Sequence, residues 1–177
     1  YNEDTRFGFP VIHSCEYFYL IVLFSLEERE VNVMAINERK YENVILYLIA
    51  NMRDGMIHGK KKLAKLLYYV DFDRFEYKES METITGDSYR HRPMGPVPDQ
   101  IQDVVERMRR QGRINVKEIQ EYDNMYRPTT VYSSDVKPDM SVFDEDDKRI
   151  LERVIRHYGA SSGRDLELRS HGEAPWR

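Results

Sequence analysis

Cysteine is almost absent from this sequence, since Cys15 is the single one among 177 residues. One cysteine excludes a disulfide within the chain, and it excludes a metal site built from several cysteines. Proteins of reducing compartments rarely depend on disulfides. We therefore predict a cytoplasmic protein.

Long apolar runs are also missing. The longest one, Tyr17 to Leu26, is shorter than the roughly 20 apolar residues that cross a bilayer. The charged residues before it are mostly acidic, namely Glu3, Asp4 and Glu16 against one Arg6, whereas a signal peptide begins with basic residues. The sequence therefore predicts no membrane partner. A buried strand is one interpretation of this run, and a segment outside the natural protein is the other.

An excess of positive charge is the third feature that the chain lacks. Its formal net charge is −4, and the acidic excess lies within residues 1–33. The rest of the chain is electrically neutral, whereas nucleic-acid-binding domains are usually basic. A nucleic-acid partner is therefore not predicted.

The sequence contains none of the short motifs that announce a catalytic or cofactor site. It has no nucleophile elbow, P-loop, dinucleotide fingerprint or paired-histidine zinc motif. We predict no catalytic residue, no metal and no cofactor. One alternative stays open, in which His91 and His171, with Asp71, Asp87 and Glu173, form an acid–base or metal site of an unrecognised enzyme.

Residues 1–33 differ in character from the rest of the chain. The segment MAINERKYENVILYL begins at Met34 and reads like the amino end of a helical protein. The preceding EEREV is what a purine-rich ribosome-binding site would encode if it were translated. We expect a start that was assigned too early, and a natural domain over residues 34–177.

Apolar residues recur at helical spacing in the first half of this domain. One such stretch runs from Asn37 to Arg53. A second helix is predicted to begin after Gly59 and to reach about Tyr77. It carries a buried stripe at positions i, i+3, i+4 and i+7, formed by Leu63, Leu66, Leu67 and Val70.

Further helices are predicted by their end signals. The third lies between Pro98 and Gly112. The fourth begins at an Asp144 N-cap, with acidic residues in its first turn, and ends at Gly159. Ser161 or Ser162 caps a final short helix.

The remaining elements are β-like or irregular. RINVKEI and MYRPTTVYS predict a hairpin, and Pro128 places its second strand at a sheet edge. The stretch from Thr83 to Gln100, with three prolines, predicts a structured loop. The fold class is therefore mainly α: a compact helical domain of four to five helices with one small β-hairpin.

Two basic clusters invite different interpretations. Lys60, Lys61, Lys62 and Lys65 gather at the amino end of the second helix, where backbone N–H groups also attract anions. Bound anion, acidic partner and plain solvation all stay open for these lysines. The arginines of the third helix, including Arg109, lie near its carboxyl end, where cations are favoured in any case.

Aromatic residues are frequent on the second helix. Tyr68, Tyr69 and Phe72 exceed what one buried stripe needs, so we expect tyrosines on a contact surface beside Lys61 and Lys65. Near the end of the chain, Trp176 is expected to pack close to this helix. His171 is expected to bond a buried polar group such as Tyr68 or Asp71.

Three features in chain order carry a resemblance to a known family. They are Lys62, Leu63, Lys65, Leu66, Leu67, Tyr68 and Tyr69 on the second helix; Gly95, Pro96 and Val97 in the loop; and His171, Pro175 and Trp176 at the end. From about Tyr41 to Arg177 the chain resembles the Panacea family of SocA-like antitoxin domains, some of which are recorded as phage-associated proteins.

The resemblance implies a mostly helical antitoxin that neutralises, by direct binding, a toxin encoded by an adjacent gene. At least one relative is also described as delivering its toxin to a protease. It implies no catalysis and no cofactor. Together with Arg109, the candidate partner-binding or family-motif residues are then Lys62, Lys65, Tyr68, Tyr69, Gly95, Pro96, Val97, His171, Pro175 and Trp176.

This chain departs from the family pattern in two places. Ser170 stands where a threonine is usual, and the chain stops just after Trp176, where relatives continue into a further helix. We therefore expect a domain truncated at its carboxyl end. A DNA-binding regulator is a further alternative function, disfavoured by the neutral charge and the lack of a helix-turn-helix signature.

Overall fold

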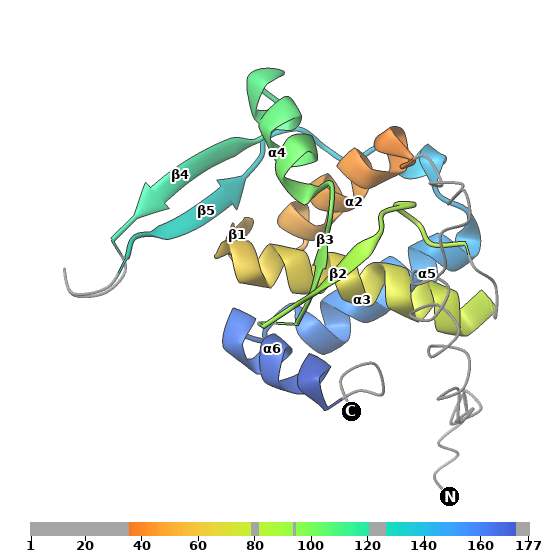
Figure 1. Ribbon diagram of the computed structural model, residues 1–177. Coiled ribbons are helices and arrows are strands. Elements are labelled where there is room, and N and C mark those ends of the chain that lie inside the picture. The colour runs from red at the N-terminus through yellow and green to blue at the C-terminus, as the bar shows by residue number, and fades with distance from the viewer. Residues whose placement is uncertain (1–35, 79–81, 94, 121–126, 173–177) are drawn as a thin grey trace, which may run out of the picture.

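The computed structural model describes residues 36–78, 82–93, 95–120 and 127–172. Along the chain it contains α2 (Glu38–Ala50), β1 (Met56–His58), α3 (Lys60–Lys78), β2 (Tyr89–Arg92), β3 (Gly95–Pro98), α4 (Ile101–Arg110), β4 (Asn115–Ile119), β5 (Thr129–Ser133), the 3-10 turn η1 (Met140–Val142), α5 (Glu145–Tyr158) and α6 (Gly163–His171). Helix α3 runs through the middle and contacts α5, α6 and β3 (Figure 1).

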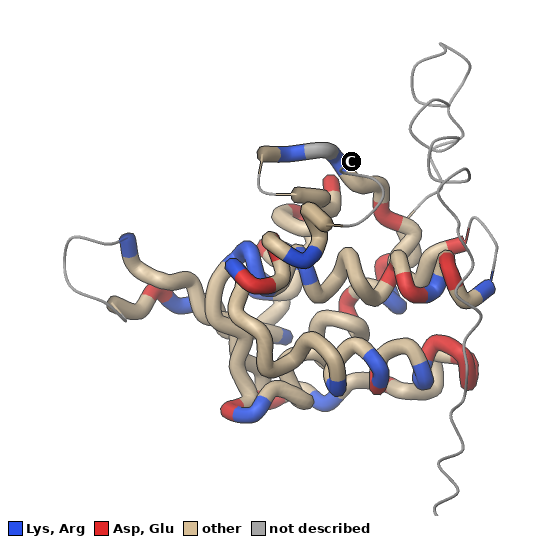
Figure 2. The backbone as a smooth tube through the Cα atoms, turned by 90° about the horizontal axis from the view of Figure 1, so that it is seen from below, with Lys and Arg blue, Asp and Glu red and all other residues tan. Residues whose placement is uncertain are grey.

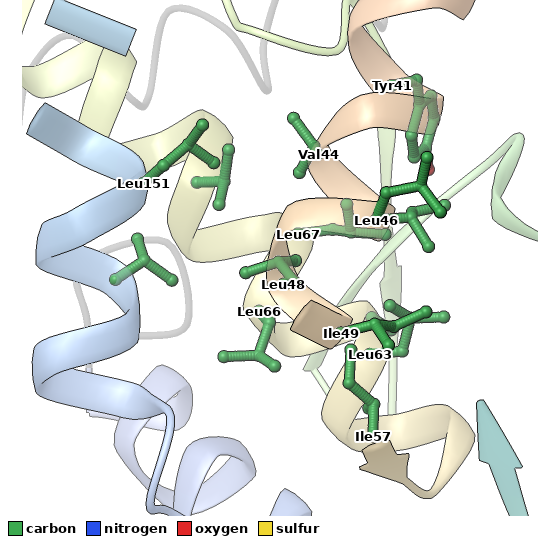
Figure 3. Close-up of a cluster of buried hydrophobic side chains, with 14 of the residues drawn as sticks. Tyr41, Val44, Leu46, Leu48, Ile49, Ile57, Leu63, Leu66, Leu67 and Leu151 are labelled. Carbon is green, nitrogen blue, oxygen red and sulfur yellow. The ribbon is translucent and has the colours of Figure 1, made fainter. Parts of the chain in front are cut away.

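Helices α2, α3 and α5 bury their apolar stripes against one another. Side chains from α2, α3, β1 and α5 interlock in this core (Figure 3). The predicted stripe of α3 is fully buried at Leu63, Leu66, Leu67 and Val70. Burial of this apolar surface is the main force that holds the helices together.

The helix predictions are confirmed, because their signals are local. Asp144 caps α5 and Ser162 caps α6, and each forms a capping box with the residue three positions later. Helix α3 extends to Lys78, one residue past the predicted end. Helix α2 ends at Ala50, before Gly55, which adopts a φ of 69° in the next turn.

The prediction of a single hairpin is wrong. The expected β4–β5 hairpin forms, but β1 joins it to make a three-stranded antiparallel sheet of order β1-β5-β4. Strand β5 is therefore central, contrary to the edge position predicted from Pro128. Pro128 precedes the first strand residue, Thr129, so its missing N–H costs the ladder nothing.

The proline-rich stretch predicted as a loop contains a second hairpin, β2–β3. The backbone N–H of Asp99 bonds to the carbonyl of Ser88, so these two residues face each other across the pair. Backbone groups alternate in direction along a strand, and Pro96 and Pro98 therefore direct their nitrogens away from β2. Proline is tolerated because no hydrogen bond is needed at those positions.

Candidate functional site

Lys65 of α3, Gly95 and Pro96 of β3 and Ser170 of α6 meet at one buried junction. The Lys65 side chain is 1% exposed. Its Nζ donates to the carbonyl of Pro96 at 3.3 Å and lies 6.0 Å from the centre of the Tyr68 ring. The prediction that Lys65 is an exposed contact residue is wrong, because its long side chain runs beneath β3 instead of into solvent.

Gly95 provides the space that this lysine occupies. Its φ is +95°, and a Cβ atom built on it would lie 1.8 Å from Lys65 Nζ and 3.0 Å from Ser170 Oγ. Glycine meets both demands, since it adopts positive φ readily and has no Cβ. Lys65, Gly95 with Pro96, and Ser170 are thus brought together, and Ser170 is completely buried there.

The amino end of α3 is covered by α6 and by the turn before it. Lys61 forms an ion pair with Glu167 at 2.5 Å, and Lys62 donates to the carbonyl of Gly159 at 2.8 Å. A Cβ atom on Gly163 would lie 3.1 Å from the backbone nitrogen of Lys62. Burial also lowers the pKa of Lys62. These contacts favour a structural role for Lys61 and Lys62 over anion binding.

The motif tyrosines are buried, contrary to the exposed position predicted for them. Tyr68 is 3% exposed and Tyr69 1%. The Tyr69 ring stacks on Tyr158 of α5, with centroids 4.0 Å apart, and the Tyr68 ring meets Tyr89 of β2 edge to face. Their rings pack α3 against α5 and against the β2–β3 hairpin. Both tyrosines therefore have a structural role in the core.

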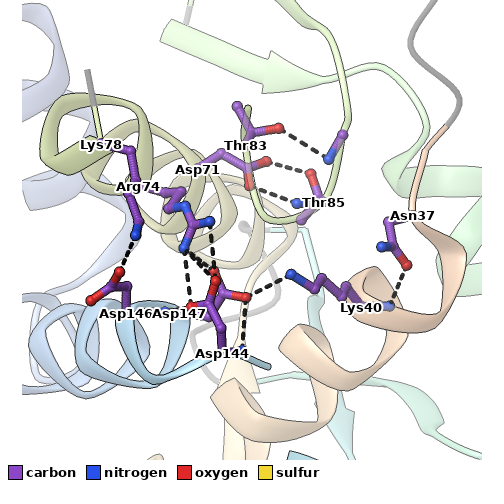
Figure 4. A network of polar contacts seen from close by, with 11 residues as sticks. Asn37, Lys40, Asp71, Arg74, Lys78, Thr83, Thr85, Asp144, Asp146 and Asp147 are labelled. Carbon is purple, nitrogen blue, oxygen red and sulfur yellow. Dashed lines mark hydrogen bonds and ion pairs between the residues drawn. The ribbon is translucent and has the colours of Figure 1, made fainter. Parts of the chain in front are cut away.

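Two buried aspartates hold the segment between α3 and β2. Asp71 accepts hydrogen bonds from the Thr85 N–H at 2.9 Å and from the Thr85 hydroxyl (Figure 4). It also accepts one from the Tyr89 hydroxyl at 2.7 Å. Burial raises the pKa of Asp71 to about 6, although these hydrogen bonds oppose the shift. Asp87 accepts from the Tyr41 hydroxyl at 2.9 Å.

These contacts weigh against the enzyme alternative. Asp71 and Asp87 are engaged with threonine, tyrosine and backbone donors, as structural carboxylates usually are. His91 lies on β2 opposite Pro96, and His171 is the last residue of α6. Within the described ranges, no group of three His, Cys, Asp or Glu side chains is arranged to hold a metal ion.

A charged network that the sequence analysis missed joins α2, α3 and α5. Asp147 is completely buried and binds Arg74 of α3 and, at 2.7 Å, Lys40 of α2 (Figure 4). Asp144 also bonds Arg74, at 3.2 Å, and Lys78 pairs with Asp146. The capping box is a local signal for Asp147, but the distant partners Arg74 and Lys40 have no sequence signature.

Arg109 is the one predicted contact residue with a described, largely exposed side chain. Its guanidinium bonds both carboxylate oxygens of Glu106 at 2.8 Å, and its side chain is 51% exposed. Arg110 bonds the same carboxylate, and its side chain is 74% exposed. These hydrogen bonds hold the pKa of Glu106 at about 2, so the group stays charged and the two arginines stay oriented.

The remaining motif residues have different positions. Val97 packs against the core from β3, whereas His171 is half-buried. Pro175 and Trp176 lie outside the described residues, as do residues 1–33 and Glu173. The predicted packing of Trp176 and the predicted hydrogen bond of His171 to Tyr68 or Asp71 stay predictions.

Basic and acidic residues are mixed along the part of the chain that the structure describes. Basic and acidic positions are interspersed along the helices in Figure 2. Several arginines near α4 pair with the acidic residues Glu38, Glu42 and Glu106. Among the described helices, none is both long enough and apolar enough to cross a membrane.

In the comparison with known proteins, the chain matches a family model. Residues 63–177 match the family described as "Antitoxin SocA-like, Panacea domain". The match starts at Leu63, later than the Tyr41 inferred from the motifs, and still covers more than half of the chain. Neither a curated protein nor a solved structure matches.

The matched residues include α3 from Leu63 onward, β3 and α6, which supply Lys65, Gly95 with Pro96, and Ser170 at the buried junction. The chain therefore belongs to the family of SocA-like antitoxins with a Panacea domain.

Proposed function

We propose that this protein is an antitoxin that neutralises a toxin encoded by an adjacent gene by binding it directly. Membership of the SocA-like antitoxin family is the observation that carries the proposal. The family motif itself supports the fold, since Lys65, Tyr68 and Tyr69 are buried. The toxin must therefore be bound by exposed side chains elsewhere.

The carboxyl half of α4 is the exposed surface best suited to this contact. Arg109 and Arg110 project from it, and both pair with Glu106. Arginine is among the residues that contribute most to protein interfaces. A side chain that is already oriented also loses less entropy on binding. An acidic surface on the toxin would pair with this arginine cluster.

Co-expression with the product of the adjacent gene tests the proposal. The adjacent gene alone is expected to arrest growth, and co-expression of this protein to restore it. Restored growth at an unchanged toxin level supports neutralisation by binding alone. A toxin level that falls only when a host protease is present supports delivery to that protease.

Arg109→Glu tests the α4 surface. The reversed charge should weaken toxin binding about tenfold or more, as loss of an interface anchor does, without changing the melting temperature. Arg149→Glu is a matched control, because Arg149 is 71% exposed and likewise pairs with an acid three residues earlier. If Arg109→Glu and Arg149→Glu bound the toxin with equal affinity, α4 would be excluded as the contact surface.

The enzyme alternative makes a different prediction. His91→Gln and His171→Gln would abolish rescue while toxin binding and melting stay unchanged. That result would contradict neutralisation by binding and would move the protein to the enzyme class.

A further inference from the structure

Strand β4 forms an open edge of the three-stranded sheet. In the part of the chain that the structure describes, β4 pairs with β5 on one side and with no strand on the other. The β4–β5 hairpin extends away from the helices (Figure 1). Four of the five β4 residues are exposed, and Ile119 is 41% exposed. An incoming chain can therefore reach this edge without displacing a helix.

The backbone groups that face the open edge can be deduced from one hydrogen bond on the far side of the sheet. The N–H of Gly59 donates to the carbonyl of Thr130 at 2.8 Å, so Thr130 faces the β1 side. Its neighbours Thr129 and Val131 then face β4, because backbone direction alternates along a strand.

The register transfers this alternation to β4. Lys117 lies opposite Val131, and Ile119 lies opposite Thr129, so both direct their backbone groups toward β5. Val116 and Glu118 therefore direct their N–H and C=O groups to the open edge. These two residues are where a further strand would form its hydrogen bonds.

A second copy of this chain fits the edge poorly. Antiparallel pairing of all five β4 residues with themselves places Lys117 directly opposite Lys117. Like charges in that position oppose pairing. A lysine on an edge strand is a common protection against self-association. An acidic residue on a different chain would instead turn Lys117 into an attractive contact.

We propose that β4 binds an extended segment of the cognate toxin as an additional strand, with an acidic toxin residue opposite Lys117 and an apolar one opposite Ile119. The inference rests on the proposed antitoxin function and names part of its contact surface. Helix α4 leads into β4 through residues 111–114, so the arginine cluster lies only a few residues before the edge strand along the chain. Backbone pairing at β4 supplies affinity, and the flanking charges supply selectivity.

Amide hydrogen exchange of the purified protein, alone and with the purified product of the adjacent gene, tests the strand geometry. The amides of Val116 and Glu118 should exchange fast in the free protein and about tenfold or more slowly in the complex, as new ladder bonds form. The Lys117 amide should be protected in both states.

Proline at the edge provides an independent test. Glu118→Pro removes an outward N–H and places a ring where the toxin strand would lie, and proline is tolerated at such edge positions. It should weaken toxin binding about tenfold or more, because hydrogen bonds and strand contact are both lost. Glu118→Ala, which keeps the N–H, should bind within about threefold of the wild type, as expected for a side chain that is not an interface anchor.

The possible results separate this proposal from the proposed function. No complex with the wild-type protein would overturn both. If a complex formed but the amides of Val116 and Glu118 exchanged as fast as in the free protein, the proposal of strand addition at β4 would be overturned and the antitoxin function would stand. If Glu118→Pro failed to fold, the exchange experiment on the wild type would still decide. Protection that rises with protein concentration, without the toxin, would assign the edge to a second copy and overturn the proposal.

Discussion

Lys65 shows how a charged residue can belong to the core of a helix. It lies between Leu63 and Leu66 on α3, and its ammonium group reaches the carbonyl of Pro96 on β3. A buried cation is tolerated only where hydrogen-bond acceptors replace water. The sequence shows that Lys65 lies among the apolar residues of α3. It does not show that the Pro96 carbonyl is the hydrogen-bond acceptor of the ammonium group.

The first residue-scale prediction concerns the charge of Lys65. Lys65→Glu should lower the free energy of unfolding by about 3 kcal/mol or more, because a carboxylate would face the Pro96 carbonyl without a cation. Lys65→Met keeps the apolar length and should cost less than about 2 kcal/mol. Urea unfolding of both variants is the measurement. Similar stability of Lys65→Glu and the wild type would mean that the ammonium group is solvated.

The second residue-scale prediction concerns the space beside Gly95. Gly95→Ala adds a Cβ at a positive φ and directs it at Lys65 and Ser170. The clash and the backbone strain together should cost about 2–4 kcal/mol. Gly112→Ala is the matched control, since Gly112 has a φ of +69° and open space around it. Gly112→Ala should lower stability by only about 1 kcal/mol, the strain of an alanine at positive φ. Thermal melts measure both variants. If Gly95→Ala and Gly112→Ala lost equal stability, the close approach of Gly95 to Lys65 and Ser170 would contribute nothing.

Among the secondary-structure elements, helices α2, α3 and α5 are joined by charge as well as by apolar packing. Asp147 accepts from Arg74 and Lys40, while Asp144 caps α5 and bonds the same arginine. The network fixes how the three helices cross, since each cation must reach a carboxylate at the first turn of α5. Satisfied polar networks of this kind favour one arrangement of a core.

The prediction at this scale is that the network depends on Asp147. Asp147→Ala leaves Arg74 and Lys40 without their shared carboxylate and should destabilise the protein by about 3 kcal/mol. Glu145→Ala removes an exposed carboxylate of the same helical turn, which pairs with Lys148, and should cost less than about 0.5 kcal/mol. Chemical unfolding compares the two. A small effect of Asp147→Ala would show that Asp144 alone suffices for Arg74.

For the whole molecule, the dependence of stability on pH reflects groups whose pKa changes on folding. Burial raises the pKa of Asp71 to about 6. An aspartate in an unfolded chain titrates near about 3.9. Between these pH values the folded protein holds a proton that the unfolded chain has released. The contribution of Asp71 to stability therefore falls as pH rises from about 4 to about 6.

We predict that Asp71 contributes about 2 kcal/mol less to the free energy of unfolding at pH 6 than at pH 4. Asp71→Asn should remove this contribution, because an amide does not titrate, so the difference in stability between the wild type and the variant should change by about 2 kcal/mol over this range. Unfolding by urea at several pH values measures it. In the variant, the raised pKa of Asp87 contributes a slope of the same sign, whereas the lowered pKa of Glu106 and of Asp144 contributes one of the opposite sign. An unchanged slope in Asp71→Asn would assign the effect to other groups.

The sequence by itself determined the helices and the family. Helices α2, α3, α5 and α6 are predictable because their periodicity, caps and end signals lie within a few residues of one another. The motif residues Lys65, Gly95 and Pro96 are recognisable as a set, and the family comparison confirms the match from Leu63 onward.

Only the tertiary structure decided what these residues contact. Burial of Lys65 and Tyr68, the pairing of Arg74 with Asp147, and the central position of β5 all join segments far apart in the chain. Such contacts depend on how elements pack in space, which no local pattern encodes. The open edge of β4 has the same cause, since a strand becomes an edge only when the order of its sheet is known.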